Sequence, residues 1–524
     1  MRDGLHLIDG LIIAAYVCAM LGLGWYYSRR QASTDEYFTG GRAMNPFLIG
    51  ISLFATLLST ISYLSSPGEI IKYGPYMMTG VLSIPLVYLI VGYLLIPVFM
   101  RHRVTSAYEL LETKLGLSTR LLGATMFIAL RVVWMAVLLN FAAEAMLVMV
   151  GDGTDELSRL LMTAAIGAVA IVYSSLGGLR AVVITDLLQF VLLFGGAILL
   201  IVTVSVRLGG FGWFPTSWDS GWQTQPLFTF DPFVRLSVVG VVVMQVLWGV
   251  CTAGGDQTVI QRYMATSDAR AARRSYLVNS IASVAVLLVL VLVGLSLKGY
   301  YQSYPQHLAA GATVANSADS LFPHFISHGL PIGVSGLVVS GMFAAAMSSV
   351  DSGVNSITAV VMSDFVNRLC GIRNRQPSKR HAHKNGDNAK HERQHVHAAR
   401  LIAVVVGVIV IGASTLIDYV PGNLAEVSKR ATGLLVTPIF TLFFLALFVR
   451  FATAVGANTG SLCGFLTAIL IAFWNPLVED RSLSITWINP MALTVGIVVG
   501  CAVSLLTCRR QIAASTTNIK ESNE

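Results

Sequence analysis

Charged residues are scarce in this 524-residue chain. Asp, Glu, Lys and Arg together make up 12% of it, whereas a soluble globular domain carries about 25%. Apolar residues reach 55%, and the mean hydropathy is +0.71. So large a deficit of charge excludes a water-soluble globule. The composition predicts an all-α protein that crosses a lipid bilayer many times.

Cysteine pairs and catalytic motifs are also missing. The six cysteines are dispersed, mostly within apolar runs, and form no CxxC pair or disulfide framework. No metalloprotease, P-loop or nucleotide-binding fingerprint occurs, and no polar segment is long enough to house a catalytic domain. The sequence therefore predicts that the protein is not an enzyme and that its cysteines only fill the core.

Hydrophobic runs of the length that spans a bilayer, about 20 residues, recur along the chain. They predict about 13 membrane spans within one transmembrane domain over 1–510. The first run is followed by no small-residue cleavage site, so it is interpreted as a span and not as a signal peptide. The expected spans are 7–27, 45–66, 76–100, 121–150, 159–178, 181–206, 234–255, 274–298, 332–366, 399–419, 431–452, 458–475 and 487–508.

Most of the 35 Lys and Arg residues fall on one side of the membrane if the N-terminus lies outside. This positive-inside bias predicts a cytoplasmic C-terminus and explains the net charge of +8 without a nucleic-acid partner. Segment 368–400 is basic and rich in histidine. We interpret it as a solvated cytoplasmic loop with some affinity for anionic lipid, and a metal site as the alternative. Residues 511–524 are predicted to be a short disordered cytoplasmic tail.

Two spans are interrupted at equivalent depth. The second span contains 55–62, reading ATLLSTIS, followed by Pro-Gly-Glu at 67–69, and the seventh contains 251–257, reading CTAGGDQ. Such a pair points to a transporter built from inverted repeats. The repeats would cover about 45–206 and 234–452, with spans 1, 12 and 13 peripheral. The alternative is that Gly and Pro are simply commoner in membrane helices.

A line of small polar side chains lies inside the apolar run at 341–364. On a helix, Ala345, Ser348 and Ser349 share one face, which can offer oxygen atoms to a hard cation. Asp351 lies beside that face and would be costly to leave ionised and unpaired in lipid. The alternative is a small-residue face on which two helices pack closely.

Three further motifs occur in order along the chain: YFTGGR at 37–42, GGLRAVVITDLLQ at 177–189 and DQTVIQR at 256–262. Together with the Ser-rich segment, they resemble the motifs of the sodium:solute symporter family over most of the chain. The resemblance implies a LeuT-type fold, with five-helix repeats over spans 2–6 and 7–11. It also implies sodium as the coupling ion.

The resemblance further implies a sodium site between the first broken helix and the Ser-rich helix. By position, its ligands are three backbone carbonyls and two hydroxyls. These belong to Ala55, Leu58, Ala345, Ser348 and Ser349. Neutral oxygens suit a weakly held monovalent ion that must leave on every cycle, whereas several carboxylates would favour a divalent cation.

Some relatives hold a second sodium ion closer to the cytoplasm. The matching positions here are Asp186, Asp351 and Ser352. Asp351 stands where the family pattern has a hydroxyl. The carboxylate leaves three interpretations open, namely a tighter cation site, a proton site and a salt-bridge partner.

Arg131 lies within a span, about 16 Å along the helix from Arg120 at ~1.5 Å per residue. A charge at that depth faces the bundle interior, and a guanidinium suits a carboxylate. The hypothesis is that Arg131 holds an anionic solute, as sialic acid members of the family use an Arg in this helix. The alternative is a structural ion pair with Asp186, Glu144 or Asp351.

The rest of the solute pocket is expected on the broken second span and just beyond it. Its members are Thr56, Ser59, Ser62 and Tyr63, with Met77 as an outer wall. Leu57 stands where many relatives have Asn or Asp, so a sugar or proline pocket does not transfer directly.

The resulting hypothesis is a secondary active symporter in the cell membrane. It would import a small polar organic solute with sodium by alternating access, and the solute is expected to be an organic anion such as a sialic acid or a monocarboxylate. A sodium/sugar or polyol symporter is the main alternative. A transporter-derived solute sensor, a sodium leak channel and proton coupling through Asp186 or Asp351 are others.

Overall fold

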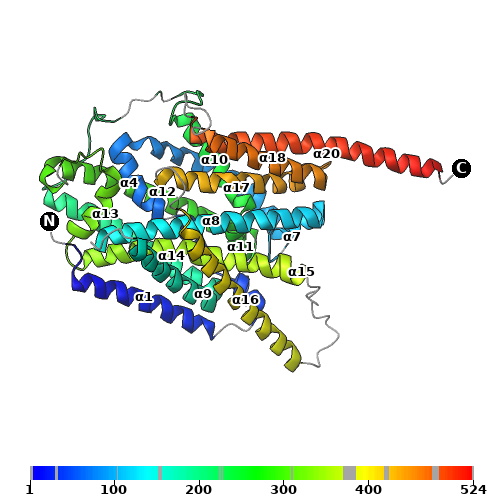
Figure 1. The fold of residues 1–524 in the computed structure, drawn as a ribbon, viewed down its shortest axis with the longest axis horizontal. Coiled ribbons are helices and arrows are strands. Elements are labelled where there is room, and N and C mark those ends of the chain that lie inside the picture. The colour runs from blue at the N-terminus through cyan, green and yellow to red at the C-terminus, as the bar shows by residue number, and fades with distance from the viewer. Residues whose placement is uncertain are drawn as a thin grey trace.

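The structure is a computed structural model. It describes residues 4–29, 33–58, 60–102, 104–150, 156–222, 226, 228–308, 311–369, 385–417, 424–474 and 483–521. Every regular element in these residues is a helix. Figure 1 shows the long helices running side by side through the body of the molecule, with α14 and α8 in its middle.

The helices up to the long loop at 208–237 are α1 (Leu7–Ser28), α2 (Thr34–Thr39), α3 (Pro46–Leu57), α4 (Thr60–Tyr73), η1 (Pro75–Ser83), α5 (Ile84–Ile90), η2 (Val91–Leu95), α6 (Ile96–Arg101), α7 (Glu109–Leu115), α8 (Leu117–Val150) and α9 (Glu156–Arg207). Those after it are α10 (Val238–Gly255), α11 (Gln257–Met264), α12 (Ala269–Ser303), η3 (Pro305–His307), α13 (Ala318–His328), α14 (Val334–Val360), η4 (Val361–Val366), α15 (Asn367–Leu369), α16 (Asn385–Ser414), α17 (Leu424–Phe448), α18 (Ala454–Ala472), η6 (Ile485–Trp487) and α20 (Ile488–Glu521).

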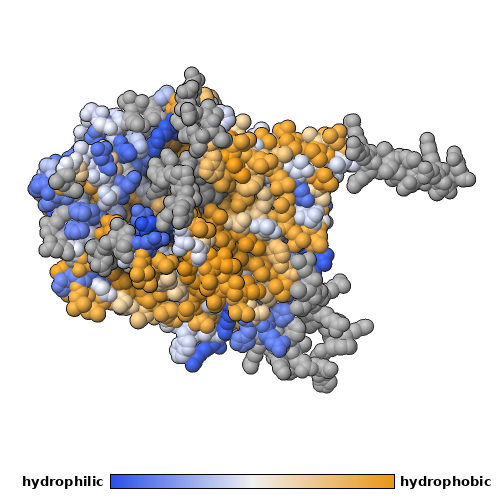
Figure 2. Space-filling view, in the orientation of Figure 1, coloured by the Kyte–Doolittle hydropathy of each residue, from blue (hydrophilic) through white to orange (hydrophobic). Residues whose placement is uncertain are grey.

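Ten helices in the described part are long and apolar enough to cross a membrane, or eleven if the bent pair α3–α4 is one span. Figure 2 shows a broad apolar surface over the middle of the molecule, with hydrophilic side chains gathered toward its ends. Large apolar residues such as Leu401, Val408 and Leu466 are exposed on the outside. Water would not tolerate so large an apolar belt. The chain is therefore a helical membrane protein with many spans.

Both interruptions expected from the sequence are real breaks in the backbone. Helix α3 ends at Leu57, and Leu58 is extended, with φ −77° and ψ 112°. Helix α4 then continues at an angle of 66° to α3. In the second half, α10 ends at Gly255, Asp256 is extended, with φ −91° and ψ 116°, and α11 follows.

A third break lies inside α9, at the glycine pair of the GGLRAV motif. Gly178 has φ 57° and ψ −167°, a conformation that side chains with a Cβ rarely adopt. The break separates the helix of the expected span 159–178 from that of span 181–206. One long element therefore contains two of the predicted spans.

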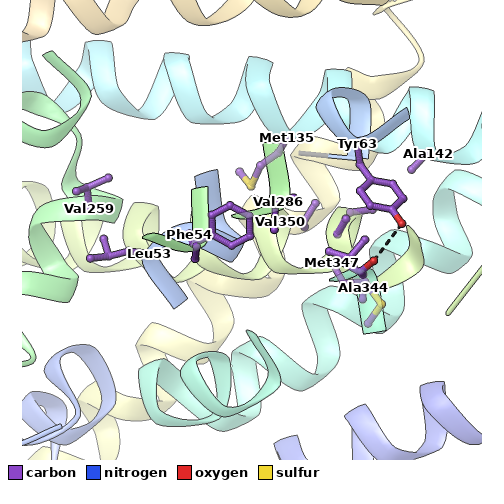
Figure 3. Packing of buried hydrophobic residues seen from close by; sticks show 14 of the residues in the cluster. Leu53, Phe54, Tyr63, Met135, Ala142, Val259, Val286, Ala344, Met347 and Val350 are labelled. Atoms are coloured by element: carbon purple, nitrogen blue, oxygen red, sulfur yellow. Dashed lines mark hydrogen bonds between the residues drawn. The ribbon is translucent and has the colours of Figure 1, made fainter. Parts of the chain in front are cut away.

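Helix α14 forms the centre of the bundle. Its most apolar stretch is 83% buried, the highest share among the candidate spans. Met347 and Val350 of α14 belong to one buried cluster with Phe54 of α3, Met135 of α8 and Val286 of α12, part of which Figure 3 shows. Buried small residues on α14 let these neighbours approach closely. The core thus fixes the Ser-rich helix against the end of α3.

Two segments expected to lack regular structure are partly helical, so those expectations were wrong for the described residues. Helix α16 begins at Asn385, inside the predicted loop 368–400, while 370–384 lie outside the described residues. Helix α20 continues to Glu521, into the predicted tail 511–524. No Gly or Pro follows Gly500, so nothing local ends that helix.

Candidate functional site

The broken end of α3 lies directly against the middle of α14. Because Leu58 leaves the helix, its N–H, which donates to the Phe54 carbonyl, makes the last backbone hydrogen bond of α3 among the described residues. Ser348 Oγ donates a hydrogen bond to the carbonyl of Ala55 at 3.0 Å, and Ser349 Oγ donates to that of Thr56 at 3.3 Å. Two serines of α14 thus donate hydrogen bonds to two carbonyls at the end of α3.

The residues of the predicted first sodium site therefore lie together. Ser348 Oγ is also 3.1 Å from the Ala345 carbonyl of its own helix. Ala55, Ala345, Ser348 and Ser349 are all buried, and Leu58 forms the break beside them. Neutral oxygens gathered at a helix break are the ligands used for sodium in transporters of this architecture. Chemically, the group can hold a monovalent hard cation.

Deeper in the bundle, a charged cluster joins α3, α9, α11 and α14. Arg262 Nη2 lies 3.2 Å from Asp186 Oδ2 and 2.6 Å from Ser352 Oγ, and Arg262 Nε lies 2.8 Å from Ser52 Oγ. Ser52 Oγ donates to the same Asp186 oxygen at 2.5 Å. All four side chains are buried. The ion pair between Arg262 and Asp186 can be buried only because each charge has a partner.

Asp351 belongs to the same cluster but has neutral partners. Its Oδ2 accepts a hydrogen bond from Tyr173 and its Oδ1 accepts one from Ser352 at 3.1 Å. Among the described residues, Asp186 Oδ1 has no hydrogen-bond partner. Two carboxylates and one guanidinium give the cluster a formal charge of −1 when both acids are ionised. One further positive charge, a cation or a proton, would balance it.

The structure thus brings Asp186, Asp351 and Ser352 together, as the second-site hypothesis requires. It adds Arg262, which sequence reasoning treated only as part of a motif. An Arg within a largely apolar protein needs a buried carboxylate. From the sequence, this need was the signal that Arg262 lies next to a buried acid. The motif residue and the predicted cation ligands turn out to form one cluster.

Arg131 of α8 forms an ion pair with Asp256 at the break between α10 and α11. Its Nε lies 3.3 Å from Asp256 Oδ1, and its Nη2 bonds Asp256 Oδ2. Their side chains are 5% and 3% exposed. The three partners suggested from the sequence, Asp186, Glu144 and Asp351, were wrong. Asp256 is 125 positions away in the chain, and only the fold places it opposite Arg131.

A small cavity opens beside this ion pair, among α3, α8, α10 and α17. Its volume is about 30 Å³, room for little more than one water molecule. It is lined by Thr56, Leu57, Leu130, Arg131, Trp134, Trp248, Thr252, Asp256 and Val436. A solute larger than water requires these helices to move apart.

The cavity contains only part of the predicted solute pocket. Thr56 and Arg131 line it, whereas Ser62, Tyr63 and Met77 do not. Tyr63 donates its hydroxyl to the carbonyl of Leu193 at 3.1 Å, the dashed line in Figure 3. Ser59 lies outside the described residues.

Six lining residues were not assigned to the pocket from the sequence: Leu130, Trp134, Trp248, Thr252, Asp256 and Val436. Two of them, Thr252 and Asp256, belong to the interrupted stretch 251–257, so the break itself was the available signal. The hydroxyl of Thr252 has no partner within the described part of the chain.

A helical bundle with two broken spans, and with cation-type oxygens where the first break meets a central helix, has the architecture of a secondary transporter. Residues 37–464 match the sodium:solute symporter family. The chain belongs to that family. Its members are transporters and not enzymes.

Relatives align along nearly the whole chain. It is 27% identical over 490 residues to the sodium/sialic acid symporter SiaT of Proteus mirabilis (strain HI4320), covering 90% of each protein. It is 30% identical over 492 residues to the sodium-dependent multivitamin transporter of Oryctolagus cuniculus, covering 89% of this chain and 70% of that one.

The fold is also similar to a solved one. A sodium-coupled sialic acid symporter in a substrate-bound, outward-open state superposes with a TM-score of 0.77 at 24% identity, covering 95% of this chain and 98% of that one. The two chains therefore share a fold.

Replacing Arg262 tests the charge balance of the cluster. We expect Arg262→Met to lower the free energy of unfolding by about 3–5 kcal/mol, because Asp186 is left buried without its cation. Adding Asp186→Asn removes that stranded charge, so the double variant should regain part of the loss. Thermal unfolding of the purified protein measures both changes. Arg368→Met, at a half-exposed ion pair with Glu112, is the control and should change little. An equal loss in Arg262→Met and in this control would contradict the description.

Proposed function

We propose that the protein is a sodium-coupled secondary active symporter that imports a small organic anion by alternating access. The observation that carries this proposal is the contact of Ser348 and Ser349 with the carbonyls of the broken α3. Family membership and relatives named for sodium-coupled transport support it. No covalent chemistry is involved.

The coupling ion would bind where α3 ends against α14. In our proposal its ligands are the carbonyls of Ala55, Leu58 and Ala345 and the hydroxyls of Ser348 and Ser349. Ser348 Oγ already links the two helices through its 3.0 Å hydrogen bond to the Ala55 carbonyl oxygen. A sodium ion would bridge the same oxygens. If sodium favours the arrangement that binds solute, solute must favour sodium equally.

We further propose a second cation position at Asp186, Asp351 and Ser352. The support is the formal charge of −1 in that cluster, in which Arg262 balances only one of two carboxylates. A sodium ion there would complete the neutralisation, and a proton is the alternative occupant. Arg262 occupies part of the space between these groups, so the cation would bind beside the guanidinium.

The solute would bind at the cavity next to Arg131. A guanidinium recognises a carboxylate in a planar, two-point geometry, which favours an organic anion such as a sialic acid or a monocarboxylate. Thr56 would contact it from α3. Ser59, Ser62, Tyr63 and Met77 would contribute in a more open conformation. A neutral sugar or polyol is the second candidate, because Asp256 already neutralises Arg131 and the Thr252 hydroxyl has no partner among the residues that the structure describes.

For the topology we propose 13 spans in the cell membrane, with the N-terminus outside and the C-terminus in the cytoplasm. The count follows if α3–α4 is one span, α9 is divided at Gly178 and α17 is included. Inverted repeats over about 45–206 and 234–452 then contain one broken helix each. The partners are the lipid bilayer, sodium ions and the solute, without nucleic acid.

Ser348 provides the test of the sodium site. Sodium should raise the unfolding temperature of the purified protein, and Ser348→Ala should remove most of that rise by deleting a ligand. Ser340→Ala is the matched control, because Ser340 is buried on the same helix and its hydroxyl donates to the Gly336 carbonyl of that helix. Sodium stabilisation that survives in Ser348→Ala would rule out this site.

Arg131 provides the test of the solute class. In the presence of sodium, a panel of sialic acids, monocarboxylates, sugars and amino acids should contain acids that stabilise the protein. Arg131→Ala should lower the affinity for those acids by about tenfold or more, while the stabilisation by sodium remains. Stabilisation by neutral sugars that persists in Arg131→Ala would instead favour the sugar or polyol alternative.

A further inference from the structure

Asp256 and the solute would compete for the same guanidinium. We propose that Asp256 occupies, on Arg131, the place of the solute's carboxylate, so that anion binding is an exchange of partners at Arg131. This inference rests on the proposed function and deepens it. It makes Asp256 a specificity-determining residue that also sets how strongly the solute depends on sodium.

The geometry of the pair leaves room for an exchange. Asp256 engages Nε and Nη2 of Arg131, while Nη1 makes no hydrogen bond to a described residue. Arg131 and Asp256 both line the cavity, and so does Thr252, whose hydroxyl is also without a partner among the described residues. An entering carboxylate would therefore meet two unused hydrogen-bond donors before it displaced Asp256.

Asp256 also has a place to remain once Arg131 has turned to the solute. Its Oδ1 accepts the backbone N–H of Thr258 at 2.8 Å, which makes it the N-cap of α11. The N-terminus of a helix stabilises a nearby negative charge. Exchange at Arg131 would thus loosen the link between α8 and the α10–α11 break, which is a change in the moving parts of such a transporter.

Charge counting connects this exchange to sodium. Arg131 and Asp256 together are neutral, so one anionic solute gives the pocket a charge of −1. The proposed sodium site adjoins it, because Thr56 lines the cavity and its carbonyl accepts from Ser349. A sodium ion in that site would return the net charge of the pocket and the site together to zero. Anion binding should therefore be weak without sodium, and Asp256 is the cause.

The test compares Asp256→Asn with the parent as full-length purified protein. Asn keeps the N-cap of α11 but removes the competing charge. N-acetylneuraminic acid and lactate serve as probes, titrated without sodium and at saturating sodium. For the acid that binds the parent, we expect the affinity without sodium to rise on the order of tenfold in Asp256→Asn, and the gain from sodium to fall by a similar factor.

Asp268→Asn is the matched control, because Asp268 is an N-cap of α12 on the surface and does not contact Arg131. It should leave both titrations unchanged. Stabilisation by sodium alone shows that each variant is folded. If the parent binds an acid but Asp256→Asn binds it with the same dependence on sodium, or loses it altogether, the exchange is refuted and the proposed function stands. If the parent binds neither acid, the proposed function fails, and the inference with it.

Discussion

The structure depends on one contact between two helices, the broken end of α3 and the small-residue face of α14. A helix that stops in the middle of a membrane leaves carbonyls without donors, and lipid cannot supply any. Here the hydroxyls of Ser348 and Ser349 supply them. The same oxygens are suited to a sodium ion. In the proposed function this contact is also the coupling site, and α14, which carries it, has the highest buried share among the candidate spans, 83%.

Buried charge imposes the second constraint. Each deep Arg in the described part of the bundle has an acidic partner on another helix: Asp186 for Arg262, Asp256 for Arg131 and Asp364 for Arg120. A lone ion at such depth would cost several kcal/mol. The pairs therefore fix how the helices meet. Where a pair lines the cavity, exchanging its partner offers a way to couple binding to movement.

The two helix breaks and the cation-type face could be predicted from the sequence, because each has a local signature. The interruption at 55–62 and the serines at 348 and 349 are visible as patterns of residue type and spacing. The depth of Arg131 along its helix likewise predicted that it faces the interior. These features require only the geometry of one helix and the cost of polar groups in lipid.

Other features could not be predicted, because they depend on how distant segments pack. Asp256 pairs with Arg131 across 125 positions, and no local pattern favours it over Asp186 or Asp351. The presence of Arg262 in the proposed second cation site is likewise a property of the assembled bundle. The cavity is set by which side chains of four helices meet, so Trp134 and Trp248 were not identified. For helix ends, the absence of a helix breaker after Gly500 outweighed polar composition.

Sodium-coupled transport is tested most directly by solute accumulation in proteoliposomes that contain the purified protein, with a radiolabelled acid chosen from the thermal panel. Sodium coupling predicts that the acid rises above its external concentration only under an inward sodium gradient, and that it equilibrates when sodium is equal on both sides. Accumulation driven by a proton gradient in sodium-free buffer would contradict it. In that case the carboxylate cluster, and not the contact between α3 and α14, would hold the coupling ion.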